Sequence, residues 1–227
     1  MGVIVQGGKT VIGSRRFGST TNPLWDDLLV YYTADNTPND SLGNYNGTLV
    51  GGTTYGTGII NNGFSFDGVN DYVTAGSPIH VYSTPTSYNM WVYPNDLSGQ
   101  QFFVYLPAGI TGPGVGILGS SLTFTRGSVN FRATSTATLS LSTWQMVTVV
   151  FKGNASYPNN VDFYLNGTYV DTKSMTGVNG IQPASLNIGG FQYFNGNVDE
   201  LSVFDRELTS TEVTELYNGG IGKQYPN

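Results

Sequence analysis

The chain has 227 residues, no cysteine and a formal net charge of −6. Its 31 glycines, 13% aromatic residues and only 11% charged residues are typical of a turn-rich β protein rather than a helical one. Without cysteine, disulfides and thiolate zinc sites are excluded, so a hydrophobic core must stabilise the fold. A chain of this length can bury such a core in one domain. The acidic balance excludes nucleic acid as a favoured partner.

Residues 1–23 are predicted to form a basic, glycine-rich arm, separate from a domain over residues 24–227. Short apolar runs on both sides of Gly7-Gly8 predict a two-stranded hairpin. Because an isolated hairpin is marginal in water, we expect it to add to another sheet, in this chain or, as we favour, in a neighbouring protein. The alternative is an unstructured tail. The predicted docking residues are Val3, Val5, Lys9, Arg15 and Arg16.

Short segments of β-type residues recur between turn signals through the rest of the chain. Such a series predicts an antiparallel sandwich or barrel. Asn166-Gly167 supplies the two positive-φ residues that a two-residue hairpin loop requires. The predicted strands are residues 28–32, 64–66, 71–73, 88–93, 102–106, 122–125, 129–132, 144–151, 161–165, 168–172, 186–188 and 198–204.

The last predicted strand carries adjacent carboxylates. Asp199 lies near its start, and strict alternation would place Asp199 on the same sheet face as Leu201 and Val203. Alternation would place Glu200 on the opposite face.

A single short helix is predicted after this strand. Thr209 and Glu212 have the spacing of a capping box, and Gly219 provides a left-handed stop. We expect one helix face to pack against the sandwich, and its residues are Val213, Leu216 and Tyr217.

Three segments in this order resemble the laminin-G-like, concanavalin A-like jelly rolls of bacterial and phage proteins. The first is the strand at residues 29–32 with the loop Asp40–Gly47, the second is Phe64–Val73, and the third is Val198–Leu208 with the capped helix. The resemblance covers about residues 28–218. It implies an all-β fold: a two-sheet antiparallel jelly-roll sandwich with one short C-terminal helix. Members of the family bind glycans or proteins and often carry one calcium ion.

The resemblance also brings four oxygen-bearing residues together as a candidate calcium site. Asp35, Asp40, Asn44 and Asp199 offer the hard oxygen ligands that calcium prefers. The alternative is that Asp35 and Asp40 shape turns through their own backbone. Leu42 departs from the family pattern in this loop, between Ser41 and Gly43, which weakens the transfer of ligands.

No catalytic residues are predicted. Glycoside hydrolysis on this type of sandwich requires paired carboxylates at a set separation. Only four glutamates exist, and none belongs to the alternating Glu-x-Asp-x-x-Glu strand motif of the related glucanases; they are Glu200, Glu207, Glu212 and Glu215.

Glycan binding would require exposed aromatic side chains near amide and carboxylate groups. The sequence does not separate exposed aromatics from core ones, so the ligand-binding residues stay unknown at this stage. The candidate aromatics are Tyr82, Tyr88, Tyr93, Tyr105, Tyr157 and Tyr193.

The sequence therefore predicts a non-enzymatic interaction domain. No apolar run suits a membrane span, and no export signal is seen at Met1. Together with the arm, these features favour a virion component such as a capsid decoration, fibre or tail protein. It would be oligomeric in its assembly, held to other structural proteins by the arm and exposing a glycan- or protein-binding domain. The alternative is a carbohydrate-binding module of an extracellular or cell-surface adhesin.

Overall fold

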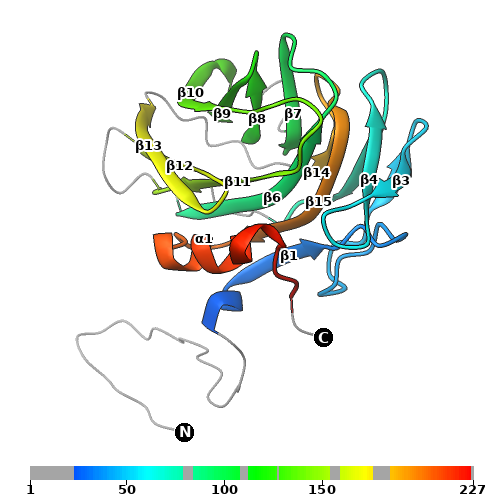
Figure 1. Ribbon diagram of the computed structural model, residues 1–227, viewed down its shortest axis with the longest axis horizontal. Coiled ribbons are helices and arrows are strands. Elements are labelled where there is room, and N and C mark those ends of the chain that lie inside the picture. Colours follow the sequence, from blue (N-terminus) through cyan, green and yellow to red (C-terminus); the bar gives the residue numbers. More distant parts are fainter. Residues whose placement is uncertain are drawn as a thin grey trace, which may run out of the picture.

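The computed structural model describes residues 23–78, 84–107, 112–126, 128–153, 159–175 and 185–225, without the side chains of 128–131 and 159. These residues form two antiparallel sheets packed face to face, with one short helix, α1, against the outer side of one sheet (Figure 1). This arrangement confirms the predicted all-β sandwich with a C-terminal helix. Among the described helices, none is long and apolar enough to cross a membrane.

One sheet has eight strands in the order β13-β12-β11-β6-β15-β4-β3, with β1 also paired to β15. The strands of this sheet are β1 (Leu28–Tyr32), β3 (Thr54–Thr57), β4 (Asn62–Asp67), β6 (Thr86–Pro94), β11 (Gln145–Phe151), β12 (Asn159–Leu165), β13 (Thr168–Met175) and β15 (Asn195–Phe204).

The other sheet has seven strands in the order β10-β9-β8-β7-β14-β5-β2. Its strands are β2 (Thr48–Val50), β5 (Tyr72–Gly76), β7 (Gln100–Tyr105), β8 (Gly114–Leu118), β9 (Ser121–Arg126), β10 (Ser128–Thr138) and β14 (Ser185–Ile188). The predicted strands lie within one to a few residues of observed ones. The prediction missed β2, β3 and β8.

The main core lies between the sheets and is built from alternate residues of both. Phe103 of the seven-stranded sheet, for example, packs edge-on against Phe194, with ring centroids 4.8 Å apart. A second apolar cluster lies on the outer side of the eight-stranded sheet, which we call the helix face because α1 (Ser210–Tyr217) packs there. In this cluster Trp91 stacks on Tyr217 at 5.5 Å. The predicted packing of the helix on the sandwich is confirmed.

Local turn and cap chemistry follows the sequence closely. Asn166 (φ 50°) and Gly167 (φ 76°) close the two-residue hairpin between β12 and β13, as predicted. The capping box of Thr209 and Glu212 is present at the start of α1. Gly219 takes the predicted left-handed conformation (φ 64°), and Asn218 before it is already left-handed and forms the C-cap, with its side chain donating to the Gly222 carbonyl (2.8 Å).

The last strand is interrupted by a β-bulge. Asp199 opposes Trp91 and Ser202 opposes Asn89, so two residues of β15 face one residue of β6. Glu200 lies at this bulge with a φ of 51°. The extra residue breaks the alternation on which the sequence analysis relied.

The predicted facing of the two carboxylates is therefore wrong. Leu201 and Val203 lie in the core between the sheets. Glu200 instead bonds to Tyr31, a member of the helix-face cluster. Asp199 bonds to the turn at residues 58–62, which packs on that same side. Both carboxylates thus share the face opposite to the two aliphatic side chains.

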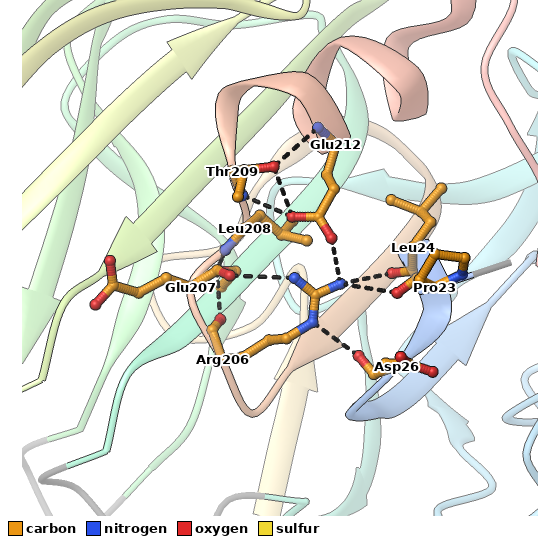
Figure 2. A network of polar contacts seen from close by, with 9 residues as sticks. Pro23, Leu24, Asp26, Arg206, Glu207, Leu208, Thr209 and Glu212 are labelled. Atoms are coloured by element: carbon orange, nitrogen blue, oxygen red, sulfur yellow. Dashed lines mark hydrogen bonds and ion pairs between the residues drawn. The ribbon is translucent and has the colours of Figure 1, made fainter. Parts of the chain in front are cut away.

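Arg206 connects the start of the described chain to the helix face through hydrogen bonds (Figure 2). The Arg206 guanidinium donates to the carbonyls of Asp26 (2.9 Å), Leu24 (2.9 Å) and Pro23 (3.4 Å). It also pairs with Glu212 (2.7 Å) at the start of α1. The predicted arm lies outside the described residues, apart from Pro23, and its attachment point lies beside the helix N-terminus.

Candidate functional site

A pocket opens on the outer side of the seven-stranded sheet, which we call the aromatic face. Val104 and Ile188 point into the core, so their neighbours Tyr105 and Asn187 point outward. Tyr105 and Asn187 are also direct partners in the register of β7 and β14. The pocket has a volume of about 180 Å³ and is lined by Tyr72, Tyr105, Pro107, Asn187, Phe191 and Tyr193.

The walls of this pocket are stacked aromatic rings. Phe191 stacks on Tyr105 with centroids 4.3 Å apart and planes 10° from parallel. Phe102 contacts both of these rings, at 5.1 and 6.0 Å. On the other side of the pocket, the ring centroids of Tyr72 and Tyr193 lie 6.4 Å apart. Phe191 and Tyr193 remain 40% and 37% exposed, so flat apolar surface is offered to a ligand.

A strained loop between β14 and β15 presents the exposed rings. Phe191 and Gln192 both have a φ of 57°, a conformation that residues with a Cβ rarely adopt. The loop is held by two backbone bonds, from Phe102 to Gln192 (3.2 Å) and from Phe194 to Gly189 (3.0 Å). Strain of this kind persists where the surroundings impose it, and it is concentrated at binding sites and other functional sites.

The pocket also contains a polar group without a partner. The Asn187 side-chain oxygen is buried and accepts no hydrogen bond, whereas nearly all buried polar groups in proteins are paired. Beside it, burial raises the pKa of the Tyr105 hydroxyl, which keeps the hydroxyl protonated. A ligand hydroxyl donating to Asn187 would satisfy the unpaired oxygen.

The sequence analysis found part of this pocket. Of its candidate aromatics, Tyr105 and Tyr193 line the pocket. Tyr88 lies in the core between the sheets, and Tyr93 packs against Trp144. Two candidates lie outside the described residues: Tyr82 and Tyr157. The residues that sequence reasoning missed are Tyr72, Pro107, Asn187 and Phe191; for Asn187, the alternation of the predicted strand at 186–188 was an available signal.

The predicted calcium ligand Asp40 holds the loop that follows β1. Its two carboxylate oxygens accept from the backbone amides of Tyr31 (2.9 Å), Leu42 (3.1 Å), Asn44 (3.1 Å) and Tyr45 (3.2 Å). Burial raises the pKa of Asp40, and three of these bonds oppose that shift. This bonding matches the turn-shaping alternative of the sequence analysis.

Two other predicted ligands meet at the turn of residues 58–62. Asp199 accepts from the amides of Ile59 (2.9 Å) and Ile60 (3.1 Å), and Asp35 accepts from that of Asn62 (3.0 Å). Burial, with a smaller contribution from the Asp35 charge, raises the pKa of Asp199 to about 7.

Within the described ranges, no three His, Cys, Asp or Glu side chains are grouped closely enough to hold a metal ion. Asp35, Asp40 and Asp199 therefore do not form one carboxylate cluster, and their oxygens already accept backbone hydrogen bonds. The calcium site stays a prediction of the sequence. The docking residues Val3, Val5, Lys9, Arg15 and Arg16 lie outside the described residues.

Glu200 lies beside Asp199 and is almost fully buried. Its oxygens accept from the Tyr31 hydroxyl and from the Gln224 side chain (2.9 Å), and burial raises its pKa to about 8. Glu200 and Asp199 are 2% and 1% exposed. They are enclosed by the turn at 58–62 and the C-terminal segment, so they contribute to packing rather than to an open cleft.

Comparison with known proteins agrees with the fold and the sequence motifs. The family model of the concanavalin A-like lectin/glucanases superfamily matches residues 67–214. The chain belongs to this superfamily. No curated protein sequence matches it.

Several solved structures share the fold at low sequence identity. Domain 4 of AbnA, an extracellular GH43 arabinanase from Geobacillus stearothermophilus solved with arabinotriose, is 19% identical with a TM-score of 0.67, over 83% of this chain and 97% of that one. The botulinum neurotoxin serotype C1 binding domain is 16% identical with a TM-score of 0.70, over 89% and 53%. The binding domain of Paraclostridial Mosquitocidal Protein 1 is 18% identical with a TM-score of 0.68, over 86% and 53%. The chain thus spans about half of each toxin domain.

Proposed function

We propose that this protein is a non-enzymatic glycan-binding module that binds a sugar ring in the pocket of the aromatic face. The observation that carries the proposal is the stacked pair of Phe191 and Tyr105 beside the unpartnered oxygen of Asn187. Aromatic faces bind the apolar C–H faces of sugars, and a small number of polar groups fix their hydroxyls. The pocket supplies both.

The composition of the pocket also argues for binding rather than hydrolysis. Glycoside hydrolysis requires two carboxyl groups flanking the scissile bond, and none of the six lining residues carries one. Further support comes from the superfamily, which includes lectins, and from the AbnA domain, which shares the fold and was solved with arabinotriose.

Calorimetric titration of wild type and Phe191→Ala tests the proposal. A glycan array first selects ligands, with arabinotriose included as a defined neutral probe. We expect Phe191→Ala to weaken binding about tenfold or more, because stacking on one ring is worth roughly 1–3 kcal/mol. Tyr169→Ala is the matched control, since it removes a 48% exposed aromatic from β13. Absence of any glycan ligand, or unchanged binding by Phe191→Ala, would contradict the proposal.

The predicted virion role concerns where such a module is displayed. It depends on residues 1–23 and stays a prediction. Deleting residues 1–22 is its test, since this leaves the Pro23 carbonyl that accepts from Arg206. Loss of assembly with retained glycan binding is expected for a virion component, whereas an adhesin module would be unaffected by the deletion.

A further inference from the structure

Buried polar atoms without partners gather in the seven-stranded sheet. In the described part of the chain, six buried side-chain nitrogen or oxygen atoms have no hydrogen-bond partner, and five belong to this sheet. The sixth is the Tyr55 hydroxyl in β3. Because each such atom costs roughly 1–3 kcal/mol when left unpaired, a concentration on one sheet calls for an explanation. The five atoms are Gln100 Nε2, Thr123 Oγ1, Thr125 Oγ1, Arg132 Nε and Asn187 Oδ1.

Three of these residues fall in one row across the aromatic face. Asn187 opposes Tyr105, Tyr105 opposes Gly114, Gly114 opposes Thr125, and Thr125 opposes Arg132. Neighbouring strands lie about 4.8 Å apart, so this row extends roughly 19 Å from the pocket to β10. It is long enough for several sugar units rather than one.

The Arg132 side chain lies on the outer side of this sheet and bonds to a side chain of β7. Ala133 points into the core, so Arg132 points outward. Its Nη2 donates to Gln100 Oε1 at 2.7 Å, although β10 and β7 are separated by β9 and β8. The hydrogen bond therefore joins side chains of two strands that are not neighbours in the sheet. The unpaired hydroxyls of Thr123 and Thr125 are on β9 and face the same way.

The charge of Arg132 has no counter-ion among the described residues. Its one polar contact there is the neutral amide of Gln100, and its Nε is buried without a partner. The described ion pairs are instead made by Lys152, Lys173, Arg206 and Lys223. A partly buried guanidinium normally pairs with an anion, and its fork fits a planar carboxylate or a sulfate.

We propose that Arg132 forms an anion-binding subsite and that the glycan recognised by this face is acidic, carrying a carboxylate or sulfate group. This inference rests on the proposed function of the aromatic pocket. Gln100 and Phe102 lie on the same side of β7, about 7 Å apart. One oligosaccharide therefore reaches both the Phe102–Tyr105–Phe191 rings and the guanidinium.

Matched pairs of acidic and neutral oligosaccharides test the subsite by calorimetric titration. The probes are sialyllactose against lactose, trigalacturonate against its methyl ester, and a heparin hexasaccharide against its desulfated form. We expect one acidic member to bind about tenfold or more tightly than its neutral partner, and less so at high salt. The first two pairs report on carboxylates and the third on sulfates.

Substitutions at Arg132 then assign the preference to this residue. Arg132→Gln should abolish the preference, and Arg132→Lys should retain part of it because lysine keeps the charge but not the fork. Lys223→Gln is the control, since it removes a positive charge at the helix face. Circular dichroism establishes that each variant is folded.

The outcomes separate the two proposals. Equal binding of acidic and neutral members, or a preference that survives in Arg132→Gln, overturns the anion subsite. If glycans bind and Phe191→Ala weakens them in that case, the proposed function stands. If no glycan binds, both proposals are wrong.

Discussion

The two outer faces of the sandwich each carry an arginine, and the two arginines differ in how many hydrogen-bond partners they have. On the helix face, Arg206 donates to four backbone carbonyls and pairs with Glu212 (Figure 2). On the aromatic face, the one polar contact of Arg132 among the described residues is the neutral amide of Gln100. All three guanidinium nitrogens of Arg206 have partners in the protein, whereas Arg132 has one hydrogen-bond partner among the described residues. Under the proposed function, stability and recognition are thus divided between the two sheets.

Buried polar residues of the two sheets repeat this contrast. On the helix face, Thr148 donates to Asn89 (2.6 Å), and Glu200 accepts from both Tyr31 and Gln224. On the aromatic face, the hydroxyls of Thr123 and Thr125 have no partner. Because an unpaired buried hydroxyl costs roughly 1–3 kcal/mol, the sheet of the aromatic face satisfies its buried polar groups less completely than the sheet of the helix face.

The largest expected effect is a pH dependence of stability that originates on the helix face. The pKa of Glu200 is raised to about 8 and that of Asp199 to about 7, in both cases chiefly by burial. The folded state therefore holds protons that the unfolded chain releases above its ordinary carboxyl pKa values of roughly 4. Their stabilising contribution is complete below that pH and is lost as the pH rises through 7 and 8.

Urea unfolding at pH 5, 7 and 8.5 measures this dependence. We expect the free energy of unfolding to fall by on the order of 3 kcal/mol over this range in wild type. Glu200→Gln should flatten the decline, since an amide has no proton to lose. Glu207→Gln, at an exposed carboxylate, is the matched control. A wild-type stability that is constant with pH, or an equal decline in Glu200→Gln, would contradict the role of burial.

Substitution of Arg206 should have the next largest effect on the free energy of unfolding. Arg206→Ala leaves several backbone carbonyls and Glu212 without their donor, so we expect a loss of about 2 kcal/mol of unfolding free energy. Glycan affinity should be unchanged, because the aromatic face is on the other sheet. Arg206→Lys should fall between the two, as it retains the charge without the fork. A loss of glycan affinity in Arg206→Ala would contradict the proposal that glycan binding is confined to the aromatic face.

The sequence predicted those features that depend on local chemistry. The Asn166-Gly167 hairpin, the Thr209 and Glu212 cap and most strands follow from residues a few positions apart. Strands β2, β3 and β8 were missed because they are short or rich in glycine, and glycine gives no alternation signal. β3 pairs with β4 and β8 pairs with β9 across short turns, whereas β2 pairs with the more distant strand β5.

The site was less predictable because it depends on register and on a bulge. Nothing near Arg132 in the sequence indicates that its side chain meets Gln100, three strands away in the sheet. Likewise, one extra residue at Glu200 reverses the expected facing of Asp199. The sequence analysis listed Tyr105 among the candidate aromatics, but only the fold places its ring against Phe191.

The same substitution at two buried threonines gives the smallest effect and the sharpest test of the comparison. Thr125 is 1% exposed and unpaired, whereas Thr148 is 0% exposed and bonded to Asn89. Valine has nearly the shape of threonine without its hydroxyl. Thr125→Val should therefore raise the unfolding free energy by about 1 kcal/mol, and Thr148→Val should lower it by about as much.

Glycan affinity should be unchanged in both variants, because neither buried hydroxyl is open to a ligand. Chemical denaturation and calorimetric titration of both variants measure the two quantities. Equal changes of stability in the two variants would contradict the contrast between an unpaired and a paired hydroxyl, because only the loss of a paired hydroxyl removes a hydrogen bond.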